Sequence, residues 1–303
     1  MDRNDFGQLV AALRKEVFDE DGNRLTQKEL ANRIAAERPA TALTEVVIGK
    51  IERGERANLE ADSLQDLADA LNLTMGERHT FFLLGIGLDH PQIHPAFASE
   101  PALLDGVLQM LADIQIPALL LDHYLDIVAV NRAVLQLYQL PSSLITQLQN
   151  LPTNLNLLTF IFSPLFQAVR AEMPADSWHR FAVGNVIYFR RVSLPYRMTP
   201  YYESLLKELR RNREFRFFWE QALYEEKLNF VGGESFARQS TEVGRLRYLT
   251  APLVTLTPYG NLEIVAHIPR DAATATAFSQ YDYENEPKVL VVSSWPEKLE
   301  RLS

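Results

Sequence analysis

The sequence predicts an α+β protein in which an all-helical N-terminal domain precedes an antiparallel sheet with flanking helices. Three observations favour this fold class. Apolar residues recur at helical spacing through residues 1–90, a segment with two prolines in six residues follows, and aliphatic runs typical of strands begin only after it. A chain of 303 residues is also long enough for about two domains. We therefore expect a helical domain over 1–90, a linker over 91–101, a second domain over 102–272 and a C-terminal extension over 273–303.

Five short helices are expected in the first domain. An apolar stripe over Phe6–Val17 predicts the first helix, and the segment Thr26–Glu29 is a capping box that begins the second. Thr44 is placed to cap a third helix, which glycine ends ten residues later. Leu64–Leu71 and Met75–Leu84 carry the apolar sides of the fourth and fifth helices. Together these helices predict a compact bundle.

Strands and further helices are expected in the second domain. The aliphatic runs 118–122 and 126–130 predict a hairpin, and Asn131 is placed to cap the helix that follows. The runs 244–257 and 262–268 predict a second hairpin around a turn that contains Pro and Gly. Helices are expected over 102–111, 132–138, 176–192, 200–212 and 214–227.

Composition and charge narrow the classes of function. The chain has no cysteine, which excludes disulfides, thiol nucleophiles, iron–sulfur clusters and Cys-ligated zinc. Its first ten residues are charged and polar, and no run approaches the roughly 18 consecutive apolar residues of a membrane span. We therefore expect a soluble, cytoplasmic protein without a membrane partner. A net charge of −9 argues against nucleic-acid binding over the whole surface but permits a small DNA-binding head.

Catalytic and metal-binding signals are weak. The sequence contains no Gly-x-Ser-x-Gly elbow, phosphate-binding loop or complete dinucleotide fingerprint, and Gly85-Ile86-Gly87 lacks the third glycine. His90 and His94 lie among prolines, which favours a linker over a helical metal pair. We expect no enzymatic activity, no catalytic residue, no metal site and no required cofactor.

The first domain contains, in this order, the segments Leu25–Ala31, Ile48–Gly54 and Leu64–Leu71. With them it resembles, over about residues 6–86, the Xre/Cro family of bacterial and phage repressors. The resemblance implies a helix-turn-helix whose second helix, which begins after Thr44, enters the major groove of operator DNA.

The resemblance also implies individual DNA contacts. The residues implied at base edges are Glu45, Val46, Gly49 and Lys50, and those implied at phosphates are Gln27 (phosphate or base), Thr44, Arg53 and Arg56. The connection between Ile34 and Thr44 is longer than the tight turn of the family. Residues 1–90 contain 11 Lys and Arg against 17 Asp and Glu, so we expect selective binding with little nonspecific affinity. The alternative is a bundle that keeps this fold without DNA and serves as a dimerisation module.

Aromatic residues gather in the second domain between positions 160 and 230. Most are explained by the need to bury a core, since aromatic side chains bury large areas. The consecutive residues Phe217, Phe218 and Trp219 point to different sides of one helix. Such a helix is either buried all round or faces both a core and a cavity.

The second domain contains, in this order, the segments Ile116–Asp122, Asp126–Asn131, Asn156–Pro164 and Glu214–Trp219. With them it resembles, over about residues 98–270, the MmyB-like ligand-binding domain, a PAS-like domain that usually follows an Xre-type head. The resemblance implies a cavity for an apolar ligand, with a long-chain fatty acid as the leading candidate. The ligand contacts expected from it are Phe160, Phe162, Trp178, Phe181, Tyr188, Phe218 and Trp219. The candidates for holding a carboxylate head group are Arg190, Arg191, Arg197 and Tyr188.

The two resemblances together imply a one-component transcription regulator. Its head would bind double-stranded operator DNA as a homodimer, because one small head touches few bases and two-fold operators supply paired half-sites. An apolar small molecule, expected to be a fatty acid, would control that binding. The alternative function is a PAS-like haem-binding or protein-interaction module whose helical head no longer binds DNA.

Overall fold

A computed structural model describes nine segments of the chain: 3–18, 22–56, 59–87, 100–138, 154–225, 235–240, 244–257, 259–281 and 287–298. His90, His94 and positions 91–99 of the expected linker lie outside the described residues. The contacts divide the chain into two compact units. The head unit comprises Met1–Pro95, Ile187–Lys207 and Trp219–Lys227, and the sheet unit comprises Ala96–Val186, Glu208–Phe218 and Leu228–Ser303.

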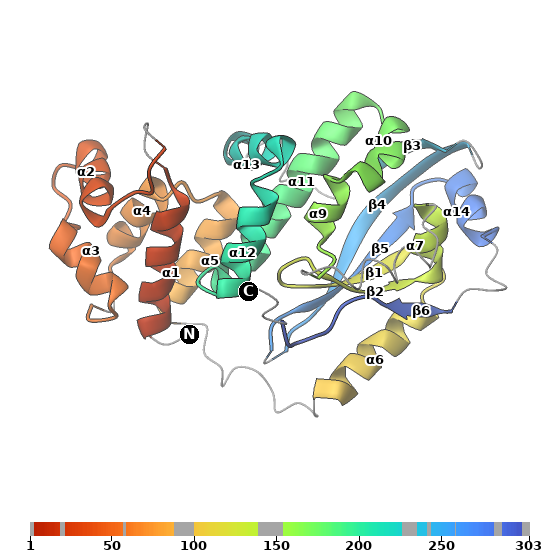
Figure 1. Cartoon of the computed structure of the whole chain (residues 1–303), viewed down its shortest axis with the longest axis horizontal. Helices are drawn as coiled ribbons and strands as arrows, with labels where there is room; N and C mark the ends of the chain where they lie inside the picture. Colours follow the sequence, from red (N-terminus) through yellow and green to blue (C-terminus); the bar gives the residue numbers. More distant parts are fainter. Residues whose placement is uncertain are drawn as a thin grey trace. The chain divides into compact units, whose positions relative to one another are not determined.

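The head unit contains the five helices expected in the first domain (Figure 1). They are α1 Arg3–Glu16, α2 Gln27–Glu37, α3 Glu45–Glu52, α4 Ala61–Ala70 and α5 Met75–Gly85. The expected caps are confirmed. The Thr26 hydroxyl accepts a hydrogen bond from the Glu29 amide (3.2 Å), and the Glu29 carboxylate accepts one from the Thr26 amide (2.6 Å). The Thr44 hydroxyl accepts from the Val47 amide (3.4 Å), so α3 begins where the sequence predicts.

The core of the head unit takes side chains from all five helices. Leu9, Leu30, Ile48, Leu64 and Phe81, one from each helix in order, are fully buried in one apolar cluster. Leu194, far along the sequence in the short 3₁₀ helix η3 Leu194–Tyr196, belongs to the same cluster. The head unit is therefore not built from the N-terminal residues alone.

Three helices contribute residues to both units. They are α11 Ala175–Ser193, α12 Pro200–Leu209 and α13 Arg213–Glu225. Each corresponds to a helix expected from the sequence. Residues 102–272, which we expected to form the second domain, therefore contribute to the head unit as well as to the sheet unit.

The sheet unit contains a six-stranded antiparallel sheet in the order β3-β4-β5-β1-β2-β6. The strands are β1 Ala118–Asp122, β2 Ile127–Asn131, β3 Ser235–Ser240, β4 Gly244–Thr255, β5 Leu262–Pro269 and β6 Val289–Val291. Both expected hairpins are confirmed, as β1–β2 and β4–β5, and so is the α+β class. β3 and β6 were not expected, because β3 is mostly polar or small and β6 has only three residues.

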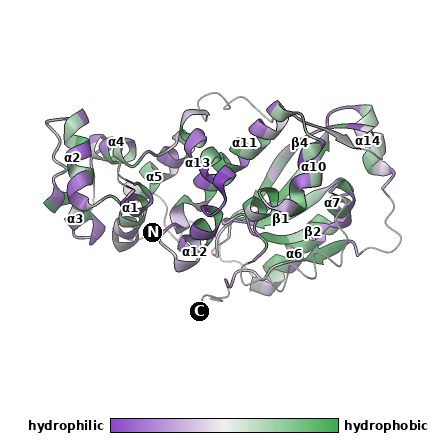
Figure 2. Cartoon of the chain, turned by 45° about the horizontal axis from the view of Figure 1, so that its top comes forward, coloured by the Kyte–Doolittle hydropathy of each residue, from purple (hydrophilic) through white to green (hydrophobic). Residues whose placement is uncertain are grey.

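Helices cover the two faces of this sheet. Val107 and Leu111 of helix α6 Glu100–Asp113 lie in one apolar cluster with Leu120, Val128 and Ile264, and Figure 2 shows β1 and β2 as hydrophobic. The opposite face carries α7 Arg132–Leu137, α9 Leu157–Ile161, the 3₁₀ helix η2 Pro164–Phe166 and the N-terminal part of α11. Helix α10 Gln167–Ala171 follows η2.

The expected C-terminal extension contributes to the sheet unit. Helix α14 Ala272–Ser279 packs on β4 and β5, and β6 pairs with β2. Beyond β6, the ammonium of Lys298 lies 2.6 Å from the Asp126 carboxylate and also contacts that of Asp122. None of the described helices is long and apolar enough to cross a membrane.

Candidate ligand cavity and DNA-facing helix

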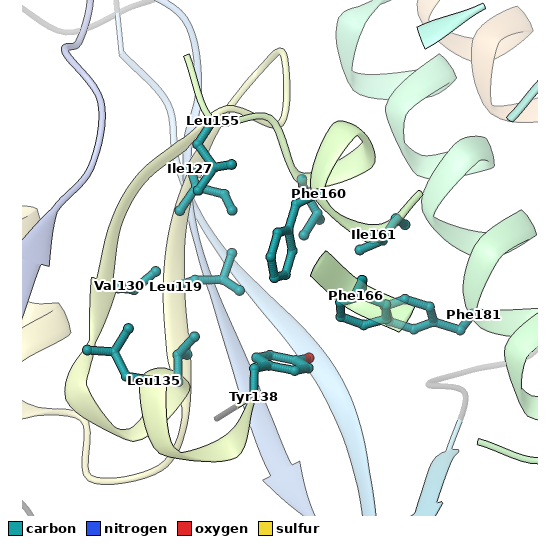
Figure 3. A pocket seen from close by; sticks show the side chains of 12 residues that line it. Leu119, Ile127, Val130, Leu135, Tyr138, Leu155, Phe160, Ile161, Phe166 and Phe181 are labelled. Atoms are coloured by element: carbon teal, nitrogen blue, oxygen red, sulfur yellow. The ribbon is translucent and has the colours of Figure 1, made fainter. Parts of the chain in front are cut away.

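An apolar cavity lies on the face of the sheet opposite α6. Along β1 alternate side chains point to opposite faces, so Leu119 and its cross-strand partner Val130 face the cavity, while Leu120 and its partner Ala129 belong to the apolar cluster under α6. Figure 3 shows Leu119, Ile127, Val130 and Tyr138 opposite the rings of Phe160, Phe166 and Phe181. The described residues that line it are Leu119, Ile127, Val130, Val134, Leu135, Tyr138, Leu155, Leu157, Phe160, Ile161, Phe166 and Phe181.

Two buried asparagines position the cavity walls. Asn131 caps α7 by accepting from the Val134 amide (3.2 Å) and also accepts from the Ala118 amide (3.0 Å), while its amide group donates to two carbonyls of the preceding loop. Asn156 caps α9 through the Leu158 amide (2.9 Å) and donates to the Tyr124 carbonyl (2.7 Å). These bonds fix the helices that carry Val134 and Phe160 to the β1–β2 hairpin.

The cavity is small in this structure. Its volume is about 30 Å³, enough for one or two water molecules but far below the roughly 150 Å³ of an apolar cavity that binds benzene. All twelve lining residues are apolar except for the hydroxyl of Tyr138. A long apolar ligand therefore requires the lining side chains to move apart, and an apolar wall makes such a ligand more favourable than water.

Phe166 is central to the aromatic side of the cavity. Its ring stacks on Phe181, with 5.9 Å between centroids, and lies within 6.3 Å of the rings of Tyr138, Phe160 and Trp178. Of the ligand contacts expected from the sequence, Phe160 and Phe181 line the cavity. The aliphatic lining from β1, β2 and α7 was missed, although the alternation of the strands could have indicated it.

Three further expected contacts form a second aromatic layer. Phe162, Trp178 and Phe218 lie 5.9–6.4 Å from one another by ring centroid and do not line the cavity. The Trp178 indole donates to the Glu214 carboxylate (3.2 Å), and the Arg170 guanidinium lies 4.4 Å from its ring centroid. Phe162, Trp178 and Phe218 thus support the cavity wall through Phe166.

A hydrogen-bond chain begins at the polar end of the cavity. The Tyr138 hydroxyl lies 2.9 Å from Nε2 of His267, and Nδ1 of His267 lies 3.0 Å from the Pro117 carbonyl oxygen. Burial lowers the pKa of His267 to about 4, so its ring is neutral near pH 7. Because the carbonyl only accepts, Nδ1 carries the proton and Tyr138 donates to Nε2. Both ring nitrogens of His267 therefore have partners.

Most of the DNA contacts expected from the sequence are exposed, on α3 or near its two ends. The exposed members are Thr44, Glu45, Val46, Lys50, Arg53 and Arg56, and Val46 exposes 66% of its surface although it is apolar. Arg53 pairs with Glu55 through two contacts of 2.7 and 3.1 Å. Gly49 is buried, and a Cβ there would lie 3.3 Å from the side-chain oxygen of Gln27.

The residues behind these exposed side chains hold α2 and α3 together. Gln27, at the start of α2, donates to the Glu52 carboxylate (2.6 Å). The same carboxylate forms a two-bond ion pair with Arg14 of α1, at 2.7 and 3.0 Å. Glu52 is thus the hydrogen-bonded carboxylate that fixes α3 against α1 and α2.

Comparison with protein families matches residues 103–280, more than half of the chain, to the MmyB-like transcription regulator ligand binding domain. The chain belongs to the MmyB-like transcription regulators. All twelve cavity residues lie within the matched MmyB-like domain. Comparison with curated proteins finds no matching relative.

The remaining expected ligand contacts lie in the part of the MmyB-like domain that joins the head unit. They are Tyr188, Arg190, Arg191 and Trp219, together with Arg197. Arg190 and Arg197 are buried and pair with Glu77 of α5, and the Arg191 guanidinium lies 5.0 Å from the Tyr188 ring centroid. None of the five lines the MmyB-like cavity. Among the described residues, no group of three His, Asp or Glu side chains is placed to hold a metal ion.

Proposed function

We propose that this MmyB-like regulator binds operator DNA through α3 and binds a long-chain fatty acid in the cavity of its sheet unit. The observation that carries the ligand half is the apolar lining: among the twelve lining residues that the structure describes, the Tyr138 hydroxyl is the one polar side-chain group. Each methylene group removed from water contributes roughly 0.8 kcal/mol, so an acyl chain gains binding energy from such walls. That gain offsets the cost of separating the lining side chains.

Helix α3 supports the DNA half of the proposal. Glu45, Val46 and Lys50 are exposed on one short helix, and a helix of this size fits the major groove of B-DNA. Thr44, Arg53 and Arg56 are exposed at the two ends of the same helix, where they would contact phosphates. Arg53 would exchange its Glu55 partner for a phosphate oxygen, a charge-assisted bond of comparable strength.

The acidic character of the head favours selective binding. Residues 1–90 carry six more acidic than basic side chains, so counterion release contributes little to nonspecific affinity. Glu45 accepts a hydrogen bond from a cytosine or adenine amino group and repels other base edges. We propose a homodimer on a two-fold operator, because one eight-residue helix reads too few bases for a unique site.

One experiment tests both halves on the same full-length protein. DNA sites are selected from a random-sequence pool, and the selected site is used in a gel shift at low salt. Palmitate is titrated separately, and its binding is followed as an upward shift of the thermal unfolding transition. A sequence-selective complex and a palmitate-dependent shift support the proposal. No selective complex contradicts the DNA half, and no shift with palmitate contradicts the fatty-acid half.

A further inference from the structure

A buried ion-pair network lies inside the head unit. The carboxylate of Glu77, in α5, is fully buried and forms two contacts with Arg190 of α11, at 3.0 and 3.1 Å. Arg197, just after η3, contacts the same carboxylate and is also buried. The two arginines hold the pKa of Glu77 at about 2 despite its burial, so the carboxylate is charged near pH 7.

The two arginines also bind other parts of the helical head. Arg190 donates to the Asn72 carbonyl (3.1 Å), in the turn before α5. Arg197 lies 3.2 Å from the Glu16 carboxylate at the end of α1, and it donates to the Arg190 carbonyl (2.7 Å). Residues from the MmyB-like match therefore hold three segments of the N-terminal helices in a defined arrangement.

The chemistry of this network favours positional specificity over bulk stability. A buried ion pair is often no more stabilising than apolar side chains of the same shape, but an unpaired buried charge is very unfavourable. Arg190 binds Glu77 with its planar group at two points, a geometry that a small displacement breaks. Because separating the pair would leave buried charges unpaired, Glu77 is expected to move with Arg190 when the end of α11 moves.

Two continuous helices connect these arginines to the cavity. Phe181 of α11 lines the cavity, and Arg190 follows it by nine residues in the same helix. In α13, Phe218 belongs to the aromatic layer around Trp178, and the next residue, Trp219, accepts a hydrogen bond from Arg190 at its carbonyl (3.3 Å). The Arg190 guanidinium also lies 4.5 Å from the Trp219 ring centroid.

We infer that Arg190, Arg197 and Glu77 transmit the filling of the cavity to the DNA-binding helices, as positioning residues rather than ligand contacts. This inference rests on the proposed function. A ligand that separates the walls displaces Phe181 and the aromatic layer, and α11 and α13 carry the displacement to Arg190. The buried network passes it to α5 and to α1, and α3 packs against α1. A ligand shifts this equilibrium only by its different affinity for the two arrangements.

The test uses full-length protein, palmitate and amide hydrogen exchange. Arg190→Lys keeps the positive charge but loses the two-point geometry, and Glu77→Gln is a second variant with the same purpose. Arg180→Lys is the matched control, because Arg180 lies on the same helix but pairs with exposed Asp176. Palmitate binding to each variant is measured separately by titration, so that a failure of palmitate to bind is distinguished from a failure to transmit its binding.

The measured quantity is the ratio of exchange rates of α3 and α5 amides with and without palmitate. We expect this ratio to differ from one by about fivefold or more in the wild type and in Arg180→Lys, the lower end of typical coupling. In Arg190→Lys and Glu77→Gln we expect palmitate to bind while the ratio stays close to one. If palmitate changes the exchange rates of both network variants as strongly as it changes those of the wild type, the inference is overturned. A role of the network in stability alone would give that result together with a lower unfolding temperature.

A substitution that fills the cavity makes the same test independent of ligand identity. Leu119→Phe adds volume at the cavity wall, and it is combined with Arg190→Lys and with Arg180→Lys. The inference requires Leu119→Phe to change the amide exchange rates of α3 and α5 in the Arg180→Lys background but not in the Arg190→Lys background. Equal changes in both backgrounds contradict it even if palmitate does not bind.

Discussion

The Tyr138 hydroxyl donates a hydrogen bond to Nε2 of His267 across 2.9 Å, at the edge of an otherwise apolar cavity. The opposite nitrogen of His267 donates to the Pro117 carbonyl, so this chain ties α7 to β5 and to the residue before β1. Tyr138 thus serves as a cavity wall with its ring and as a structural donor with its hydroxyl.

Tyr138→Phe is expected to destabilise the protein by about 1–3 kcal/mol, because it leaves a buried acceptor on His267 without its donor. Palmitate affinity should change little, since the aromatic wall remains. Chemical denaturation measures the free energy of unfolding, and titration measures the affinity. A large loss of palmitate affinity in a folded variant would contradict this division of roles and assign the hydroxyl to the ligand.

Trp178→Ala is expected to weaken palmitate binding while leaving operator binding intact. Trp178 packs on Phe166, which lines the cavity, and removal of a buried aromatic side chain costs about 3–5 kcal/mol of stability. Trp178→Phe is the milder control and should retain most of the ligand affinity. If circular dichroism shows that Trp178→Ala unfolds the protein, Trp178 is a core residue without a separable role in ligand binding.

Gly7→Ala is expected to separate α1 from α3. A Cβ at Gly7 would lie 2.3 Å from the Ile51 carbonyl oxygen, and overpacking of this kind costs typically about 1–3 kcal/mol. Because α3 carries the proposed DNA contacts, operator affinity should fall as well. Gly106→Ala in α6 is the control, because a Cβ at Gly106 meets nothing within 4 Å. Replacing this helical glycine should raise the free energy of unfolding by about 0.5–1 kcal/mol.

Lys50→Ala is expected to weaken operator binding about tenfold, a loss at the lower end of the roughly 1–3 kcal/mol for one base contact. Lys50 is exposed on α3, so its removal should leave the unfolding temperature unchanged. Lys207→Ala removes an exposed lysine from α12 and controls for net charge. Equal affinity of Lys50→Ala and wild type in a fluorescence anisotropy titration would exclude α3 as the reading helix in the expected orientation.

Glu263→Gln is expected to remove a pH-dependent loss of stability. Glu263 is buried in β5, and burial raises the pKa of its carboxyl from 4.5 to about 7. The folded protein then binds more protons than the unfolded chain between these values, so the free energy of unfolding falls as pH rises from about 4.5 to about 7. At about 1.4 kcal/mol per pKa unit, the loss is at most about 3 kcal/mol.

The comparison of Glu263→Gln with wild type isolates this effect. The pKa of His267 is lowered by burial to about 4, which makes stability rise with pH between about 4 and 6.5 and opposes the Glu263 effect in wild type. The difference between the two denaturation profiles cancels that contribution. A difference that does not grow from pH 5 to 7 would show that Glu263 ionises normally in the folded protein.

Local sequence signals were enough to predict most helices and the two hairpins. Thr26, Thr44 and Asn131 cap helices as expected, because a cap depends on residues at most three positions away. The pairing of Glu77 with Arg190 could not be predicted in this way, since the two residues are 113 positions apart. Arg190 was expected at a ligand carboxylate because such a head group needs a cation, and the sequence alone does not show which carboxylate an arginine pairs with.

The cavity shows the same limit. The resemblance to the MmyB-like domain led us to expect Phe160, Phe181, Phe162, Trp178 and Phe218 as ligand contacts. Phe160 and Phe181 line the cavity, but Phe162, Trp178 and Phe218 lie in the aromatic layer behind its wall. Which face of a helix points to a cavity depends on the packing of the whole unit, so residue type alone does not separate lining from support. The strand alternation at Leu119 and Val130 was the usable signal for the missing wall.

The central claim, that an apolar ligand in the MmyB-like cavity controls DNA binding, is tested most directly by one affinity ratio. Full-length protein is titrated onto fluorescent operator DNA, selected by the protein itself, with and without saturating palmitate at constant salt. We predict that the operator dissociation constant changes by about fivefold or more, and that operator DNA changes palmitate affinity by the same factor. Equal dissociation constants, measured under conditions where titration shows the cavity to be occupied, would contradict the claim.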